Sequence, residues 1–301
     1  MLPCLQYFVP QHALSRFAGW LANSEITWLK NKLIRYFVNK YPVKLDEATI
    51  EDPFLYPSFN AFFTRPLKPH LRPIAAGLHD FVSPADGCIS TLGNLENGAL
   101  VQAKGHNFTV LSLLGGEAAL AKPFQQGRYA TVYLAPQDYH RVHMPMDAYL
   151  TEMIYVPGNL FSVNHRTAEY IPELFARNER VVCLFNTSQG RMSMVLVGAM
   201  IVGSIETLWA GTITPRLKRE IKSFIYDSPI FLRRGEEMGR FKLGSTVIVL
   251  TESAALNFEL SFITAKNEKV VMGQRIGSFK NTTVPLSRHE AQASSLTLSQ
   301  S

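Results

Sequence analysis

Short apolar runs separated by turn residues fill this chain from about residue 80 onward, and they constrain its fold more than any other feature. Most of these runs are too short for a typical helix and are bounded by Gly, Asn or Pro, as the strands of a compact β protein are. The runs are 130–134, 150–156, 181–185, 192–202, 246–250 and 256–263. We therefore expect an α+β protein with a mostly antiparallel β core over residues 76–286.

The first 75 residues differ from this pattern. Apolar residues recur at helical spacing between residues 12 and 39, and Lys and Arg fall largely between them, which predicts an amphipathic helix. Residues 50–75 hold five of the 17 prolines, which predicts a connector, with a short helix at 58–63 docked through its aromatic side chains. An amphipathic helix either packs on the core or lies in a membrane interface, and the pattern alone leaves both open.

Positive charge is concentrated at the start of the chain. The net charge is +6, and residues 1–44 alone hold six basic residues against one acidic residue. No basic tract with interleaved aromatics is present, so a nucleic-acid partner is not expected. No run of about 18 apolar residues predicts a membrane-spanning helix. The apolar start lacks the basic region of a cleaved signal peptide, so we expect none. The polar residues 287–301 are expected to be disordered.

Neither a disulfide framework nor a metal site is expected. The three cysteines, Cys4, Cys88 and Cys183, are widely spaced and form no CxxC pair, which favours a reducing compartment. His140 and His143 have the spacing of a metal pair on a helix. The Met-Pro that follows them at 144–145 breaks a helix, and no further ligand accompanies them.

One bond, Gly244–Ser245, lies immediately before the apolar run 246–250. Glycine places no side chain beside its carbonyl and tolerates strained backbone angles, so the serine hydroxyl can attack that carbonyl. The resulting acyl shift makes an ester, and β-elimination then cuts the chain and leaves Ser245 as an N-terminal pyruvoyl group. By itself the motif also fits an ordinary turn that leads into a strand.

Three blocks along the chain resemble the signature segments of the phosphatidylserine decarboxylase family, in the same order. They are Ser-Pro-Ala-Asp-Gly at 83–87, Asp-Tyr-His-Arg-Val-His-Met-Pro at 138–145 and Leu-Gly-Ser-Thr at 243–246. Further similarity lies at 103–107, 156–165, 174–180 and 197–207, so that the resemblance covers roughly residues 5–285. The form that the chain most resembles is the bacterial proenzyme.

The resemblance implies that Asp86, His143 and Ser245 are the catalytic residues of the domain 76–286. In this assignment His143 takes the proton of the Ser245 hydroxyl and Asp86 orients the imidazole, an arrangement defined by geometry and not by chain order. Self-cleavage at Gly244–Ser245 would give chains 1–244 and 245–301, which must stay associated without a covalent link. Taken alone, Asp86 before a glycine also fits a turn residue.

The implied reaction is decarboxylation of phosphatidylserine to phosphatidylethanolamine. The implied cofactor is the covalent pyruvoyl group made from Ser245, whose ketone forms a Schiff base with the substrate amine. That group accepts the electrons released when CO₂ leaves, by the same logic as pyridoxal phosphate. His143 is a candidate for returning a proton to the substrate carbon, because an imidazole changes charge near neutral pH.

The substrate phosphate requires hydrogen-bond donors or a positive group. We expect His140 to supply one and His165 to line the substrate region, with Arg177 a weaker candidate. The resemblance also implies a homodimer on the cytosolic face of a bacterial inner membrane. It favours the membrane-associating interpretation of residues 1–75, whose basic residues suit an anionic surface.

Two other functions fit parts of the sequence. A serine hydrolase would use the same three residues on an external ester, but no Gly-x-Ser-x-Gly elbow surrounds Ser245. A noncatalytic β-domain would only bind membrane through its basic N-terminus, and it would not need three blocks whose residues fit one mechanism. An intact 33.8 kDa chain without a ketone would favour either of these.

Overall fold

The computed structural model describes residues 6–103, 106–200, 204–216, 218–242, 245–252 and 258–281. Its centre is an antiparallel sheet of eight strands. In spatial order they are β12 (Lys222–Leu232), β7 (Ala148–Val156), β8 (Arg180–Thr187), β9 (Gly190–Val197), β14 (Ser245–Thr251), β5 (Arg128–Leu134), β2 (Gly87–Asn94) and β16 (Lys269–Val270). The predicted runs 130–134, 150–156, 181–185 and 246–250 are strands of this sheet, as is most of 192–202.

Three smaller sheets accompany the central one, and every strand pair among the described residues is antiparallel. The four-stranded sheet has the order β11 (Gly211–Thr212), β10 (Ser204–Thr207), β13 (Glu237–Lys242) and β6 (Arg141–His143). The three-stranded sheet has the order β1 (Asp80–Val82), β17 (Arg275–Asn281) and β15 (Phe258–Phe262). The two-stranded sheet pairs β3 (Ala99–Ala103) with β4 (His106–Thr109).

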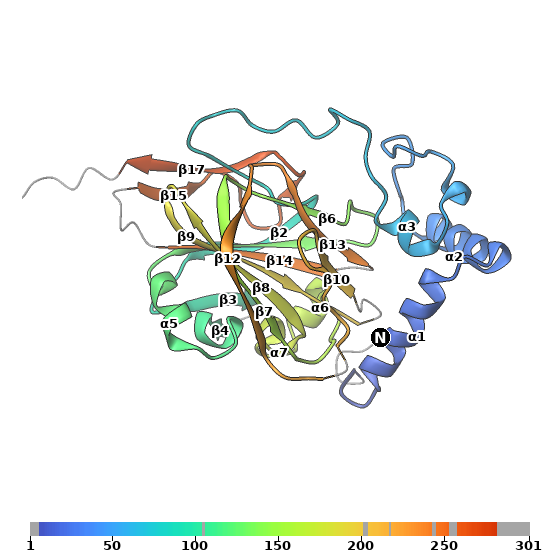
Figure 1. The fold of residues 1–301 in the computed structure, drawn as a ribbon, viewed down its shortest axis with the longest axis horizontal. Coiled ribbons are helices and arrows are strands. Elements are labelled where there is room, and N and C mark those ends of the chain that lie inside the picture. The colour runs from blue at the N-terminus through green and yellow to red at the C-terminus, as the bar shows by residue number, and fades with distance from the viewer. Residues whose placement is uncertain are drawn as a thin grey trace, which may run out of the picture.

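The helices of the first 63 residues lie together at one side of the strands (Figure 1). They are α1 (Gln11–Asn23), α2 (Thr27–Lys40), the 3-10 turn Pro53–Leu55 and α3 (Phe59–Phe63). The prediction of one continuous helix over 12–39 was wrong, because Ser24 adopts an extended conformation and ends α1. The short helix predicted at 58–63 is confirmed, and the hydroxyl of Ser58 caps it by accepting the N–H of Ala61.

Four short helices and a second 3-10 turn cover part of the β-rich region. They are α4 (Val110–Leu113), α5 (Ala118–Ala121), Lys122–Phe124, α6 (His165–Ala168) and α7 (Leu174–Arg177). Side chains of β14 alternate between two cores: Val247 and Val249 belong to one, and Ile248 and Leu250 belong to the other, which also contains side chains of α4 and α7. Burial on both faces explains the unbroken apolar run of β14. The predicted antiparallel β core is thus confirmed, and the predicted disordered tail 287–301 lies outside the described residues.

Candidate active site

The Gly244–Ser245 bond lies where the chain passes from one sheet to another. Strand β13 of the four-stranded sheet ends at Lys242, and β14 begins at Ser245 in the interior of the eight-stranded sheet. Within that sheet, Ser245 is opposite Leu134 of β5, and Thr246 is opposite both Tyr133 of β5 and Val197 of β9. Gly244 lies outside the described residues, and Ser245 is described by its backbone. Pairing on both sides of β14 therefore fixes the backbone on the C-terminal side of the candidate cleavage bond.

His143 ends strand β6 and is held as a neutral base. Its Nδ1 lies 2.9 Å from the carbonyl oxygen of Gly235, which can only accept, so Nδ1 carries the proton. Its Nε2 is therefore the basic nitrogen, and the Tyr139 hydroxyl donates to it at 3.2 Å. Burial lowers the pKa of His143, against the raising effects of the Gly235 carbonyl and the Glu237 carboxylate. The imidazole is thereby suited to accept a proton at neutral pH.

The backbone of Gly235 makes this orientation of His143 possible. Its φ of +80° lies in the left-handed region, which glycine adopts without strain. A Cβ at this position would also lie 2.7 Å from the side chain of Ile74 in the connector. Any other residue at position 235 would therefore disturb the carbonyl that fixes the His143 tautomer.

Asp86 lies next to His143 in the fold, but its carboxylate has other partners. The backbone N–H of His143 donates to the Pro84 carbonyl at 2.8 Å, which brings β6 beside the segment that carries Asp86. Arg72 donates from Nε to both carboxylate oxygens of Asp86, at 2.9 and 3.0 Å, and from Nη2 at 2.6 Å. The N–H of Met272 donates to Oδ1 at 2.8 Å. In the described structure, then, the Gly235 carbonyl orients His143, and Asp86 acts on His143 through its charge.

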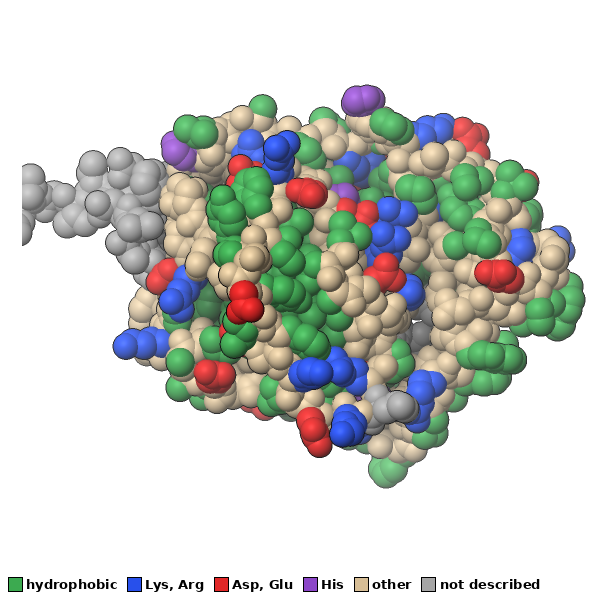
Figure 2. All heavy atoms as spheres, in the orientation of Figure 1, with side chains coloured by type: hydrophobic (Ala, Val, Ile, Leu, Met, Phe, Trp, Pro, Cys, Tyr) green, Lys and Arg blue, Asp and Glu red, His purple; other side chains and the backbone are tan. Residues whose placement is uncertain are grey.

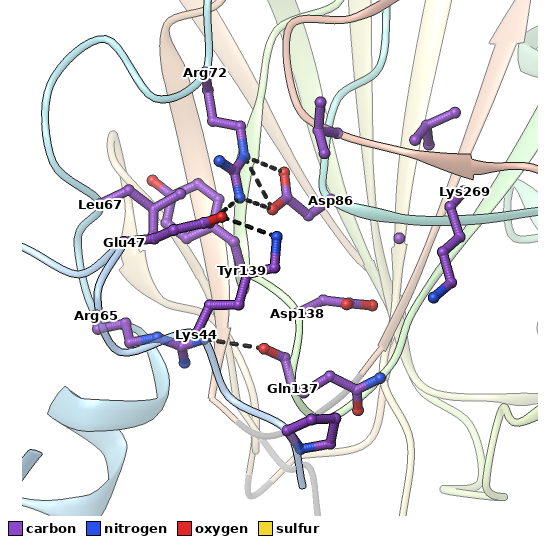
Figure 3. A pocket seen from close by; sticks show the side chains of 14 residues that line it. Lys44, Glu47, Arg65, Leu67, Arg72, Asp86, Gln137, Asp138, Tyr139 and Lys269 are labelled. Atoms are coloured by element: carbon purple, nitrogen blue, oxygen red, sulfur yellow. Dashed lines mark hydrogen bonds and ion pairs between the residues drawn. The ribbon is translucent and has the colours of Figure 1, made fainter.

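A cavity of about 330 Å³ opens beside Asp86 (Figure 3). Lys44, Glu47 and Arg72 line it from the N-terminal region and connector, and Asp138 and Lys269 line it from the β-rich region. Burial raises the pKa of Asp138, although its Oδ2 accepts the N–H of Ala135 at 2.7 Å. The cavity is therefore lined by charged side chains of both signs.

A second cavity, of about 550 Å³, separates the N-terminal helices from the sheet. Its walls are mostly apolar: α1 and α2 contribute Leu21, Leu33 and Phe37, and the end of β5 contributes Tyr133 and Leu134. Because Leu134 is the residue opposite Ser245, this cavity lies beside the start of β14. Its size and lining suit an apolar chain of a lipid next to the candidate cleavage site.

The structure places the predicted phosphate ligand His140 in the core. The residue is fully buried, and its ring packs on Phe63 with 4.0 Å between the centroids. Its Nδ1 donates to the Asp138 carbonyl at 2.8 Å. Burial lowers the pKa of His140 to about 3. A neutral imidazole whose Nδ1 proton is already donated to Asp138 has no donor left for a phosphate. Because the ring is buried against Phe63, it would also have to leave that position to reach one.

The other predicted substrate residues lie near the N-terminal segment. His165 begins α6, just after residues 162–164, which line the apolar cavity. Arg177 ends α7, where its Nη1 donates to the Tyr7 hydroxyl at 3.2 Å and its guanidinium lies over the rings of Tyr7 and Phe161. Arg177 thus holds the start of the described chain against the β-rich region.

Sequence reasoning missed three residues of this site: Arg72, Tyr139 and Gly235. Tyr139 lies inside the quoted block 138–145, where its position beside the two histidines was the available signal. Arg72 and Gly235 come from distant segments, and no local pattern marks them.

No group of three or more His, Cys, Asp or Glu side chains that could hold a metal ion converges in the described part of the chain. None of the described helices has the length and apolar character needed to cross a membrane.

Comparison with known proteins gives a consistent result. A sequence profile described as phosphatidylserine decarboxylase matches residues 59–278, and a second profile, described as PSD, matches residues 4–42. The phosphatidylserine decarboxylase proenzyme of Pseudomonas putida strain W619 is 58% identical over 249 residues, 81% of this chain and 86% of that protein. The proenzyme of Pseudomonas fluorescens is 54% identical over 276 residues, 90% of this chain and 95% of that protein.

A protein of the same name from Pseudomonas aeruginosa is 58% identical over 251 residues, 82% of this chain and 86% of that protein. These relatives are all named proenzymes, which places the chain among enzymes that are made as precursors. The chain belongs to the phosphatidylserine decarboxylase family. The resemblance noted from its three blocks is thereby confirmed.

Proposed function

We propose that the chain cuts itself between Gly244 and Ser245 and then decarboxylates phosphatidylserine to phosphatidylethanolamine. The observation that carries the proposal is the position of this bond, at the two-residue junction between β13 and β14 in a chain of this family. Relatives named proenzymes support the processing step. The serine hydrolase and the noncatalytic membrane-binding domain are left as outcomes of the test.

In the first step the Ser245 Oγ attacks the Gly244 carbonyl carbon, and the peptide C–N bond gives way to an ester. His143 Nε2 is our candidate for taking the hydroxyl proton, because the Gly235 carbonyl fixes the tautomer that leaves a lone pair on Nε2. The Tyr139 hydroxyl now donates to that nitrogen and would give way to the Ser245 hydroxyl. Removal of the Ser245 Cα proton then drives β-elimination, which breaks the ester bond between Cβ and Oγ of Ser245. Chain 1–244 leaves with a C-terminal carboxylate, and hydrolysis of the dehydrated serine releases ammonia and leaves a ketone.

The residues present fit a pyruvoyl group at position 245. The group supplies an electron sink for loss of CO₂ from an amino-acid head group. We assign His143 as the donor that protonates the substrate carbon after cleavage, since the same buried imidazole can receive and return a proton. Asp86 is assigned as the negative charge that stabilises the protonated form of His143.

We infer that the N-terminal helices bring the site to an anionic membrane. Several large side chains of α1 and α2 are exposed, among them Trp20 at 66% and Trp28 at 68%. Aromatic side chains next to Lys and Arg on one helical pair suit the interface of a bilayer. The apolar cavity between these helices and β14 would then receive part of the lipid. We extend the proposal to peripheral attachment at the cytosolic face of a bacterial inner membrane, the location that the resemblance to bacterial proenzymes implies.

A homodimer completes the proposal, and β12 is the surface that we assign to it. This strand is one edge of the eight-stranded sheet. Figure 2 shows hydrophobic side chains gathered over the middle of the face where β12 runs. Ile225 is 76% exposed, and Phe231 packs beside Tyr149 with 4.8 Å between the ring centroids. A second copy would cover these side chains.

The decisive experiment is intact mass under denaturing conditions, with and without borohydride, on wild type and on Ser245→Ala. The proposal expects two wild-type fragments that meet at Gly244–Ser245, a reducible N-terminal ketone on the smaller one, and an uncut variant. Assay with phosphatidylserine vesicles then tests the substrate. An uncut wild-type chain that retains activity would sink the mechanism, and labelling of Ser245 by a fluorophosphonate would point to the hydrolase.

A further inference from the structure

Arg72 of the connector links the carboxylate of Asp86 to that of Glu47, which lies in the N-terminal region. One edge of its guanidinium contacts both oxygens of Asp86, with the shortest distance 2.6 Å (Figure 3). Its Nη2 also contacts the Glu47 carboxylate at 2.6 Å, and Glu47 in turn accepts from Lys44 at 3.0 Å. Arg72 is thus fixed on two sides by carboxylates. A doubly anchored guanidinium has little freedom to move away from Asp86.

Burial makes this contact strong. The side chains of Arg72 and Asp86 are only 11% and 10% exposed. Apart from Arg72, the Met272 N–H is the hydrogen-bond donor that the described structure gives to this carboxylate. A carboxylate removed from water needs such partners, and losing the cation leaves an uncompensated charge. Without Arg72 the Asp86 carboxylate would therefore leave its present position and turn toward water.

Such a movement of Asp86 would act on His143. Burial lowers the pKa of His143, and the negative charges of Glu237 and Asp86 are among the groups that oppose this effect. The other charged or titratable groups around Asp86 are Arg65, Asp138, Tyr139 and Lys269. Arg65 directs its Nη2 to the Gln137 carbonyl at 3.0 Å. Within the described residues, Arg72 is the cation that touches Asp86 directly.

We propose that Arg72 is a positioning residue for self-cleavage, which fixes the charged carboxylate of Asp86 so that it can stabilise protonated His143. The proposal rests on the proposed function, because it concerns the cutting step at Gly244–Ser245. It assigns a role to the proline-rich connector, which brings Arg72 into contact with Asp86. It makes no use of the reaction that follows cleavage.

The test measures the rate of self-cleavage by intact mass in newly synthesised wild type, Arg72→Ala and Arg72→Lys. We expect Arg72→Ala to cut roughly tenfold to a hundredfold more slowly, as misplacement of a catalytic group typically does. Arg72→Lys should fall between, because an ammonium keeps the charge and loses the two-pronged contact. Circular dichroism checks that each variant is folded.

Chemical rescue separates positioning from a purely structural role. The space left by Arg72→Ala adjoins the cavity of about 330 Å³, so added guanidinium ion can reach it. Guanidinium at concentrations that do not unfold the protein should restore cleavage of Arg72→Ala, whereas urea, which has the same shape without the charge, should not. The matched control is Arg275→Ala, which removes a different Arg–Asp pair, between Arg275 Nη1 and Asp80 Oδ1 at 3.5 Å. This variant should cut at the wild-type rate in all conditions.

Two results would overturn the proposal. One is cleavage of Arg72→Ala at the wild-type rate. The other is slow cleavage of Arg72→Ala and Arg72→Lys alike with no response to guanidinium, which would make Arg72 a scaffold residue. Wild-type protein serves as the separate check: if it is not cut at Gly244–Ser245, the proposed function fails, whereas a failure confined to the Arg72 variants leaves it standing.

Discussion

His140 and His143 are three residues apart in sequence, and the fold gives them opposite surroundings. His140 packs on Phe63 of α3 and is closed off from water. His143 directs one nitrogen to a backbone carbonyl and the other to the Tyr139 hydroxyl. Sequence periodicity indicates that residues three apart on an extended segment point to different sides. That separation lets His140 pack in the core while His143 stays available for the role of base that we propose.

The burial of His140 makes the stability of the protein sensitive to acid. Its folded pKa of about 3 lies below the ordinary value of 6.5, so the unfolded chain binds a proton more readily than the folded chain. Its contribution is fully present above about pH 6.5 and is lost as the pH falls toward 3, by about 1.4 kcal/mol per pH unit for one proton.

Urea unfolding at pH 7 and pH 5 measures this contribution, in uncut Ser245→Ala protein so that one chain unfolds. Asparagine at position 140 can keep the hydrogen bond to Asp138 without titrating. His140→Asn should therefore lose about one proton from the pH dependence of unfolding. An unchanged dependence would mean that His140 is protonated in the folded protein, contrary to its burial.

The residues of the site were predictable from sequence only where they lie inside the three blocks. Asp86 and His143 carry a recognisable local pattern, and the structure brings their segments together through the Pro84 carbonyl. The partners that hold them were not predictable. Arg72 meets Asp86 because the connector folds back over the β-rich region, and Gly235 meets His143 because a turn before β13 passes beside β6. Contacts of this kind depend on tertiary structure and leave no periodic signal.

At the scale of elements, α1 and α2 show how a helical pattern can hide a break. The apolar spacing continues from α1 into α2, so periodicity alone predicts one helix. The helix itself is interrupted at the polar residues Ser24 and Glu25. The extended backbone at Ser24 lets α1 and α2 differ in direction. Ile34 and Phe37 of α2 then pack on α3, while the two tryptophans stay exposed.

The exposed tryptophans allow a direct test of membrane attachment. Replacing Trp20 and Trp28 by serine removes apolar surface that would enter the bilayer interface. Since full burial of a large apolar side chain contributes about 1.5 to 3 kcal/mol, we expect at least a tenfold loss of binding. Sedimentation with anionic phosphatidylglycerol vesicles measures it, and cleavage at Gly244–Ser245 should continue.

Leu78 provides the matched control for the tryptophan test. It is 88% exposed but follows the connector, just before β1. Leu78→Ser should bind vesicles as the wild type does. Equal binding by the tryptophan variant and the wild type would argue that α1 and α2 pack against protein and do not touch the membrane.

Strands differ in how well the sequence reveals them. The runs that form β5, β8 and β14 are apolar on both faces, and their positions were predicted. Strand β12 was missed because it contains Asp227 and Pro229. These residues fall in a register break between Ile225 and Ile230, on an edge strand where proline costs no ladder hydrogen bond in the sheet interior. The polar residues of an edge strand conceal it from a search for apolar runs.

At the scale of the whole molecule, the proposed cut divides the chain but not the fold. Residues 245–281 contribute β14 to the centre of the eight-stranded sheet, β16 to its edge, and β15 and β17 to the three-stranded sheet. They also supply the Met272 N–H that holds Asp86. The candidate site is therefore assembled from both proposed chains, and neither chain contains it alone.

This arrangement predicts that the two chains separate only when the protein unfolds. Strand β14 pairs with β5 and β9 along its length, and four of its side chains, Val247 to Leu250, are at least 99% buried. Each contributes about 1.5 to 3 kcal/mol by burial. A native sizing column should therefore elute chains 1–244 and 245–301 together. Because unfolding of cut protein releases two molecules, its midpoint in urea should rise with protein concentration, whereas uncut Ser245→Ala should show no such dependence. Elution of a separate small chain from native, active enzyme would contradict this account of how the halves are held.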